Sequence, residues 1–227
     1  MRLRDGTDVG DVRLDRLVQF DDRSRRYGAV RAADEPLEQR HWSCDVVLDQ
    51  GNEGACVGYS LTHDLIAEPL DTEMRATKRV PFARRVYRRA KRIDEWPGTG
   101  YEGTSVLAGC KVLRRAGAID RYEWAFGLYE VLKVVSNEGP VVLGIAWYES
   151  MYAAPDGRVA VEGSVAGGHA IVCNGINPEA ETVTLHNSWG PDWGSGGEAE
   201  LGWGDLDRLL SEQGEAVRLI RSARGKR

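Results

Sequence analysis

Hydrophobic positions follow a helical period in the first half of the chain. The segment "ACVGYSLTHDLI" places Val57, Leu61 and Leu65 near one face of a helix that begins after a glycine-rich loop. A second helix is predicted over "PFARRVYRRAKRIDE", because Pro81 suits a first helical turn. A third is predicted over "VLAGCKVLRRAG", residues 106–117. The first half of the chain is therefore expected to be mainly helical.

Short apolar runs typical of strands dominate the chain after a further short helix predicted over "LYEVLKVVSNEG". They are "PVVLGIAW" (140–147), "GHAIVCNGI" (168–176), "ETVTLHNSW" (181–189), "GEAELGW" (197–203) and "EAVRLI" (215–220). A helical half followed by a strand-rich half predicts an α+β fold of two lobes, with a site in the cleft between them. We place the helical lobe at about residues 50–117 and the β-rich lobe at about 118–227. Residues 1–40 are polar and are predicted to form an N-terminal arm with at most one short strand.

Composition narrows the class of protein without identifying it. The chain has 227 residues, 42% hydrophobic and 29% charged, with a net charge of −5 and a pI near 5.5, which fits a globular protein and gives no support for nucleic-acid binding. The basic run at 83–92 is interpreted as a solvated helix face. No apolar stretch is long enough to span a membrane, and the first residues lack the apolar core of a secretion signal, so a cytoplasmic location is expected.

Four cysteines, Cys44, Cys56, Cys110 and Cys173, are widely spaced and form no CxxC pair. A zinc site is therefore not expected, no other part of the sequence implies a metal or organic cofactor, and a disulfide framework is neither required nor excluded. Cys56 differs from the others because it lies where the loop "QGNEGA" leads into a predicted helix. The partial positive charge at a helix N-terminus lowers the pKa of a thiol, so Cys56 is a candidate nucleophile. The alternative is a buried structural thiol.

A cysteine nucleophile needs a base and a group that orients the base. His169 begins a predicted strand in "AGGHAIVC", where two glycines leave room for a substrate backbone. His186 and Asn187 are neighbours in a strand and must point to opposite faces, so only one of them can face His169. An Asn187 carbonyl would orient the imidazole without adding charge. Gln50 could donate an N–H to a developing oxyanion beside the backbone N–H of Cys56.

The blocks "DQGNEGACVGYS", "GGHAIVCNGI" and "LHNSWGPDWGSGGEAEL" resemble, in order, the three signature blocks of the papain-like cysteine peptidases. The resemblance implies a two-lobed papain-like fold whose second lobe is barrel-like. It assigns the nucleophile to Cys56, the general base and acid to His169, the orienting amide to Asn187 and the oxyanion donor to Gln50. Trp189 matches the tryptophan that shields the Asn–His hydrogen bond in that family.

The segment "GTGYEGTSV" resembles the family's glycine-rich wall, which binds an extended peptide like an added strand. The match implies that the backbone of Glu102 and Gly103 forms one wall of a substrate cleft. Gly168 and Ala170 would form the opposite wall. The expected partner is thus a polypeptide in extended conformation.

The chain departs from the family at Glu53, which stands where the first signature cysteine is usual, so the local disulfide is absent. This departure fits a reducing compartment and is similar to prokaryotic or phage members. A carboxylate at Glu53 would favour basic substrates near the cleft.

The expected activity is hydrolysis of peptide or isopeptide bonds through a thioester acyl-enzyme at a Cys-His-Asn site. Two alternatives remain: an acyltransferase or amidase that uses the same residues, and a structural or binding protein on a papain-like scaffold that does not turn over. The sequence leaves open the substrate, the side-chain preference, the oligomeric state and whether residues 1–40 are inhibitory.

Overall fold

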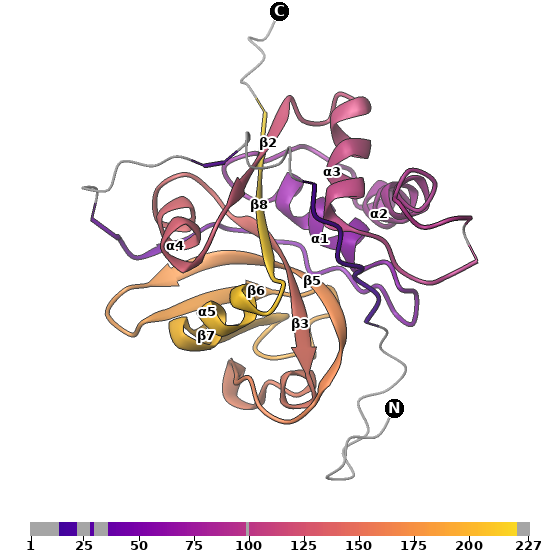
Figure 1. Cartoon of the computed structure of the whole chain (residues 1–227). Coiled ribbons are helices and arrows are strands. Elements are labelled where there is room, and N and C mark those ends of the chain that lie inside the picture. The colour runs from indigo at the N-terminus through magenta and orange to yellow at the C-terminus, as the bar shows by residue number, and fades with distance from the viewer. Residues whose placement is uncertain (1–13, 22–27, 30–35, 99, 222–227) are drawn as a thin grey trace, which may run out of the picture.

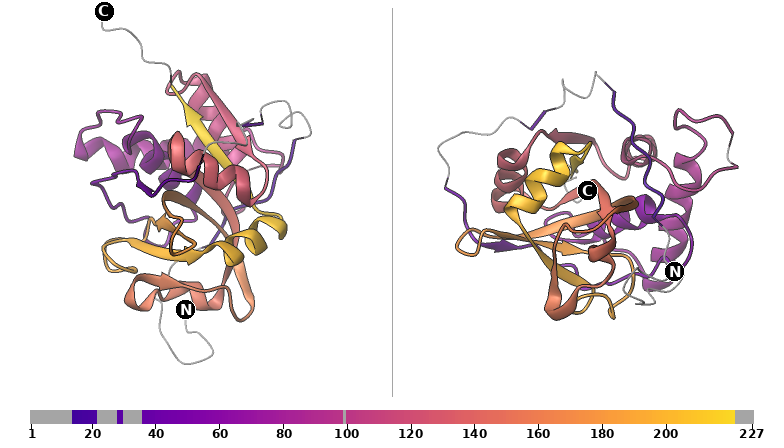
Figure 2. Two further views of the ribbon diagram at one scale, coloured as in Figure 1. Left: turned by 90° about the vertical axis from the view of Figure 1, so that its left-hand side faces the viewer. Right: turned by 60° about the horizontal axis from the view of Figure 1, so that its bottom comes forward.

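Helices lie on both sides of a central sheet in the computed structural model, which describes residues 14–21, 28–29, 36–98 and 100–221. The first group is α1 (Cys56–Ile66), α2 (Ala76–Ala90) and α3 (Val106–Arg115), and the second is α4 (Leu128–Asn137) and α5 (Trp203–Ser211). Figure 1 shows α1–α3 together at one side and α4 and α5 at the other, and the views in Figure 2 keep this separation. The predicted α+β architecture with two lobes is confirmed.

Within the described part of the chain, eight strands form one sheet. In chain order they are β1 (Arg40–His41), β2 (Arg121–Ala125), β3 (Val141–Tyr148), β4 (Arg158–Val159), β5 (Val165–Asn177), β6 (Thr182–His186), β7 (Glu198–Gly202) and β8 (Glu215–Ile220). The strand order is β2-β8-β3-β5-β6-β7-β4, and β1 pairs with β5. The sheet is open, with β2 and β4 at its two ends, so the barrel-like closure expected of the second lobe is not observed in the described part of the chain.

Both faces of β3 and β5 are buried, which explains their nearly continuous apolar sequence. Leu143 and Ile145 pack in the core under α4 and α5, whereas Val142 and Ala170 pack in the core under α1 and α3. The two strands are antiparallel, with Gly144 opposite Ala170 and Ile145 opposite His169. Side chains alternate along β5, so His169 lies on one face of the sheet, and its neighbours Gly168 and Ala170 lie on the face covered by α1 and α3.

Helix α1 is buried almost throughout, because α2, α3 and β5 surround it. Two glycines allow this close packing. A Cβ atom at Gly58 would lie 2.3 Å from the carbonyl oxygen of Ala83 in α2, and one at Gly109 in α3 would lie 2.3 Å from Cδ1 of Leu61. Gly58, which interrupts the helical pattern in the sequence, is thus the residue that lets α2 approach α1.

Two elements, α2 and β2, differ from what the sequence predicts. Helix α2 begins at Ala76, so Pro81 lies inside the helix rather than in its first turn. The cost is limited, since Pro81 lacks only one backbone donor and the side chains before it are largely exposed. Strand β2 is not predicted, because it is short and carries charged residues, although Tyr122 and Trp124 alternate into the core.

The solvated face predicted for the basic run is confirmed, since Arg84, Arg85, Arg88 and Arg89 are all exposed along α2. None of the helices within the described ranges is both long enough and apolar enough to cross a bilayer.

Candidate active site

Cys56 is the first residue of α1 and is completely buried. Backbone N–H groups of Ala170, Asp15 and Val57 approach its sulfur, which places the thiol between the start of the helix, strand β5 and the N-terminal segment. Burial dominates its electrostatics and raises the pKa of the Cys56 thiol to about 11, despite these hydrogen bonds. In this arrangement Cys56 is therefore a protonated thiol at neutral pH.

His169 and Asn187 form a buried pair. The Nε2 atom of His169 lies 2.9 Å from Oδ1 of Asn187. Because the amide oxygen can only accept, Nε2 carries a proton and Nδ1 of the neutral ring does not. Within the described residues, Nδ1 of His169 has no hydrogen-bond partner. Burial lowers the pKa of His169 to about 4, against the hydrogen bond to Asn187, so the ring is neutral at pH 7.

Aromatic rings surround the His169 imidazole. The ring centroid of Trp189 is 4.8 Å from that of His169, and Trp147 is 4.7 Å away. Trp189 also stacks on Tyr152, with centroids 5.7 Å apart. Trp189 thus lies where the sequence predicts a shield for the His169–Asn187 hydrogen bond. The sequence pattern does not predict a role for Trp147, whose one signal is its place on β3, two residues after the residue paired with His169.

Gln50 joins the loop before α1 to the loop that holds Asn187. Its Oε1 accepts a hydrogen bond from the Ser188 hydroxyl at 2.7 Å, and its Nε2 donates to the Glu53 carbonyl at 2.9 Å. The backbone N–H of Gln50 also donates to the Ser188 carbonyl. These bonds fix the Gln50 side chain in the loop that leads into Cys56.

An extended part of the N-terminal arm lies between the two predicted walls of the cleft. The Arg16 N–H donates to the Gly168 carbonyl at 2.9 Å, the Leu17 N–H donates to the Thr104 carbonyl at 3.0 Å, and the Thr104 N–H donates to the Asp15 carbonyl at 3.2 Å. In Figure 1 this indigo segment runs beside α3 and β5. The structure thus brings residues 15–17 over Cys56, which the sequence pattern does not predict.

The arm approaches the walls at glycines. A Cβ atom at Gly103, where φ is +85°, would lie 1.7 Å from the Asp15 carbonyl oxygen, and one at Gly168 would lie 2.3 Å from that of Arg16. Gly103 and Gly168 are both residues that the family resemblance predicts as walls of the cleft. The other two wall residues have different contacts: Ala170 directs its N–H to the Cys56 sulfur, and the Glu102 carboxylate accepts a hydrogen bond from the Tyr87 hydroxyl at 3.2 Å.

Glu53 does not present an isolated carboxylate to the cleft. Its Oε2 lies 2.6 Å from Nε of Arg84, and Arg88 is within 4.0 Å. The ion pair lies at the position where the resembled family usually has a disulfide and where the sequence of this chain predicts none. Arg84 compensates the charge of the Glu53 carboxylate, so Glu53 gives little reason to expect basic substrates.

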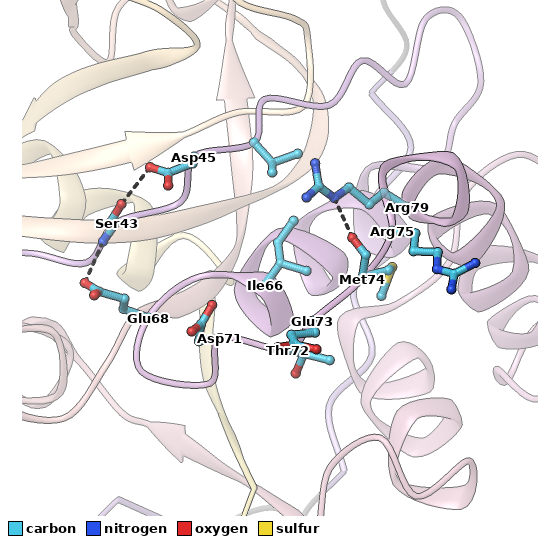
Figure 3. Close-up of a pocket in the computed structure, with 11 residues that line it drawn as sticks. Ser43, Asp45, Ile66, Glu68, Asp71, Thr72, Glu73, Met74, Arg75 and Arg79 are labelled. Carbon is cyan, nitrogen blue, oxygen red and sulfur yellow. Dashed lines mark hydrogen bonds between the residues drawn. The ribbon is translucent and has the colours of Figure 1, made fainter.

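Two of the pockets formed by the described residues border α2 and lie outside the covered cleft. One, of about 680 Å³, is drawn in Figure 3 and lies between the chain before α1, the loop after α1 and the start of α2. Its lining residues include none of the predicted catalytic side chains. The second, of about 350 Å³, lies next to the wall formed by Glu102 and Gly103. It is lined by Glu53, Tyr87, Arg88, Lys91, Arg92 and Glu102.

A second hydrogen-bond network, partly exposed to solvent, holds the loop of Asn187 from its other side. Glu198 accepts hydrogen bonds from Nδ1 of His186 at 3.0 Å, from Nε2 of His41 at 3.0 Å and from the Asn174 amide at 2.7 Å. Nε2 of His186 donates to the Val46 carbonyl at 3.0 Å. His186 therefore points away from His169, as strand alternation predicts for the neighbour of Asn187.

This network predicts a loss of stability at alkaline pH. Burial opposes a charge on His186, but hydrogen bonds with Cys44 and Glu198 outweigh it and raise the pKa of His186 from 6.5 to about 9. A raised histidine pKa stabilises the fold fully below pH 6.5, and this contribution disappears as the pH rises through 9. The pKa of Glu198 is lowered, despite burial, by its hydrogen bonds with His186, His41 and Asn174, so its contribution is lost only in acid.

We expect the free energy of unfolding in urea to fall by about 2–3 kcal/mol between pH 6 and pH 9.5 through His186 alone. The His186→Gln chain, which has no titrating imidazole at this position, should show a correspondingly flatter profile over the same interval. Identical profiles for the two chains would contradict the assignment of a buried imidazolium at His186.

Comparison with solved structures identifies the fold. The chain superposes on xylellain, a cysteine protease from Xylella fastidiosa, with a TM-score of 0.70, 16% identity and coverage of 92% of this chain and 96% of that one. It also matches procathepsin B S9 from Trypanosoma congolense (TM-score 0.60, 12% identity, 91% and 82% covered). A third match is the Carica candamarcensis cysteine protease CMS1MS2 in complex with E-64 (TM-score 0.55, 15% identity, 77% and 92% covered).

These matches show that the chain has the papain-like fold. No protein-family model and no curated relative matches the sequence.

Proposed function

We propose that the protein is a cysteine peptidase that hydrolyses peptide or isopeptide bonds, with Cys56 as nucleophile and His169, Asn187 and Gln50 as its partners. The observation that carries this proposal is that an extended polypeptide, residues 15–17 of the chain itself, lies hydrogen-bonded between Gly168 and Thr104 over the Cys56 thiol. A cleft that binds a main chain in this way suits a polypeptide substrate. The papain-like fold supports the same conclusion.

The arm must leave the cleft before a substrate can bind. Once water or substrate replaces it, the sulfur at the N-terminus of α1 is no longer enclosed, and the partial positive charge of the helix favours the thiolate. The thiol proton passes to Nδ1 of His169, the ring atom that has no hydrogen-bond partner among the described residues. The Asn187 carbonyl accepts from Nε2 and holds the ring in this tautomer.

Acylation follows from these positions. The Cys56 sulfur attacks the substrate carbonyl carbon, and the oxyanion is received by the Cys56 N–H and the Gln50 amide. The C–N bond breaks as His169 gives its proton to the leaving amine. His169 then removes a proton from water, which attacks the thioester, releases the carboxylic acid and restores the thiol. Trp189 and Trp147 exclude water from the His169–Asn187 hydrogen bond throughout.

Cleavage of an unfolded polypeptide tests this function. The Arg16→Ala chain, in which the arm is held less tightly, should cut carboxymethylated casein and give new termini by mass spectrometry. Adding Cys56→Ala should lower the rate by on the order of 10³-fold or more, because the nucleophile is gone. A matched Cys44→Ser change, at a cysteine outside the cleft, should leave the rate within about threefold.

Equal cleavage by the Cys56→Ala and Cys44→Ser chains would contradict the proposal. The products also separate hydrolysis from the alternatives. With an ordinary primary amine added at millimolar concentration, a hydrolase still gives mainly carboxylic acids, whereas an acyltransferase gives amides in preference. No cleavage of any polypeptide would favour a binding protein on a papain-like scaffold.

A further inference from the structure

Arg16 of the arm inserts its side chain into a buried socket. Its Nε and Nη2 atoms donate to Oε1 of Glu215 at 3.1 Å and 2.8 Å, and Nη2 also donates to the Gln213 carbonyl at 3.2 Å. The side chains of Arg16 and Glu215 are only 2% and 4% exposed. The contact joins residues 199 positions apart in the sequence, and no motif indicates it.

The socket is built into the sheet rather than formed by the arm. Glu215 begins β8, and Gly144 of β3 pairs with it directly. A Cβ atom at Gly144 would lie 2.7 Å from Nε of Arg16 and 2.8 Å from Oε1 of Glu215, so only glycine leaves space for a guanidinium above the carboxylate. Glycine in the middle of a strand otherwise weakens the strand, which indicates that the space is used.

Glu215 requires a cation. Burial raises the pKa of its carboxyl group, whereas the charge and hydrogen bonds of Arg16 lower it. Among the described residues, Arg16 is the only cation that contacts Glu215. A carboxylate left alone in such a site carries a large desolvation cost, so any chain that replaces the arm binds better if it brings a cation.

The socket opens beside the catalytic residues. Gly144 lies opposite Ala170, the residue after His169, and the backbone of Arg16 itself donates to Gly168. The preceding residue, Asp15, lies against the Cys56 sulfur. A peptide in the cleft can thus place one side chain in the socket while its backbone passes over Cys56.

We propose that Glu215, with Gly144, forms a specificity subsite that selects an arginine side chain of the substrate, and that Arg16 fills this subsite while the arm covers the cleft. This inference rests on the proposed peptidase function and names its substrate class. Arginine is favoured over lysine, because the guanidinium satisfies both Glu215 and the Gln213 carbonyl through a planar array of donors. Glu53, which is already paired with Arg84, does not play this part.

Peptides that differ in a single side chain, which is arginine, citrulline or lysine, test the subsite. Three sets place arginine, its neutral isostere citrulline, or lysine at the first, second or third residue before the bond to be cut, and kcat/KM is measured with the full-length Arg16→Ala chain. At one of these positions arginine should exceed citrulline by about 10- to 100-fold, the range expected for a buried charge-assisted hydrogen bond, with lysine in between.

The variant Glu215→Gln, added to Arg16→Ala, should reduce the arginine-to-citrulline ratio to less than about threefold while the citrulline peptide is still cut. The matched control is Glu212→Gln, which removes a nearby carboxylate that bonds to Tyr148 and Arg208 instead, and it should leave the ratio unchanged. A ratio near one at all three positions in the Arg16→Ala chain would overturn the inference, whether or not the Glu215 variant folds.

Binding separates failure of the subsite from failure of the proposed function. Affinities of the same uncleaved peptides for the full-length chain carrying Arg16→Ala and Cys56→Ala should show the same preference for arginine. Cleavage without preference in either measurement would overturn the subsite and keep the peptidase. Preferential binding of arginine without any cleavage would overturn the peptidase and keep the subsite.

Discussion

The Arg16→Glu chain is expected to react with iodoacetamide at Cys56 about 100-fold faster than the unchanged protein at pH 7. Reversing this charge places two carboxylates in one buried socket, and removal of one partner from a buried ion pair costs about 3–5 kcal/mol. The arm should therefore leave the cleft. In the unchanged chain the thiol is enclosed, with its pKa raised to about 11, so it should react slowly.

The other cysteines provide an internal standard for this experiment. Cys44 is partly exposed, whereas Cys110 and Cys173 are buried like Cys56. Peptide mass spectrometry should show Cys44 labelled first in the unchanged chain and at the same rate in both chains. Replacement of an exposed arginine elsewhere, Arg114→Glu, should not accelerate labelling of Cys56. Labelling of Cys56 as fast as Cys44 in the unchanged chain would show that the arm does not cover the cleft in solution.

Loss of the imidazole should have the largest effect on turnover. In the Arg16→Glu background, His169→Ala is expected to reduce peptide hydrolysis by on the order of 10³-fold or more. Without the imidazole, no group accepts the proton of the Cys56 thiol and no group donates a proton to the leaving amine. Iodoacetamide labelling distinguishes this role from a structural one. With His169 present, Cys56 should react well below neutral pH, and without it only near the ordinary thiol pKa of about 8.5.

The matched control is His41→Ala, which removes a largely exposed imidazole from Glu198 and leaves His169 in place. This chain should keep both the rate and the acid-side reactivity of Cys56. If His169→Ala left the pH dependence of labelling unchanged, Cys56 and His169 would not act as a pair, and the proposed mechanism would be wrong.

Local sequence signals predict the elements that carry the candidate site. The glycine-rich loop before α1 and the apolar runs of β3 and β5 encode their own secondary structure, and α1 begins at Cys56, within one residue of the predicted start. Alternation in one strand is enough to separate His186 from Asn187, and the structure places Asn187 against His169. The catalytic roles of these residues remain predictions.

Contacts between distant segments could not be predicted in the same way. Arg16 lies in a polar stretch that resembles any solvated arm, and Glu215 is the first residue of a short strand that also carries Arg218, so its charge does not stand out. Each has an ordinary explanation by itself, and only their juxtaposition reveals the socket. The early start of α2 escapes notice for a related reason, since the polar residues before Pro81 carry no hydrophobic period.

The glycine-lined walls couple two properties that could otherwise vary separately. Gly103 and Gly168 meet the arm through backbone atoms, with no space for even one additional methyl group. A mutation in either wall that hinders the arm must hinder any incoming main chain as well, so latency and catalytic efficiency change in the same direction. The balance between them can be adjusted independently only through the arm's own side chains. Variation that tunes the onset of activity is therefore expected at positions such as Arg16, outside the domain that would perform the chemistry.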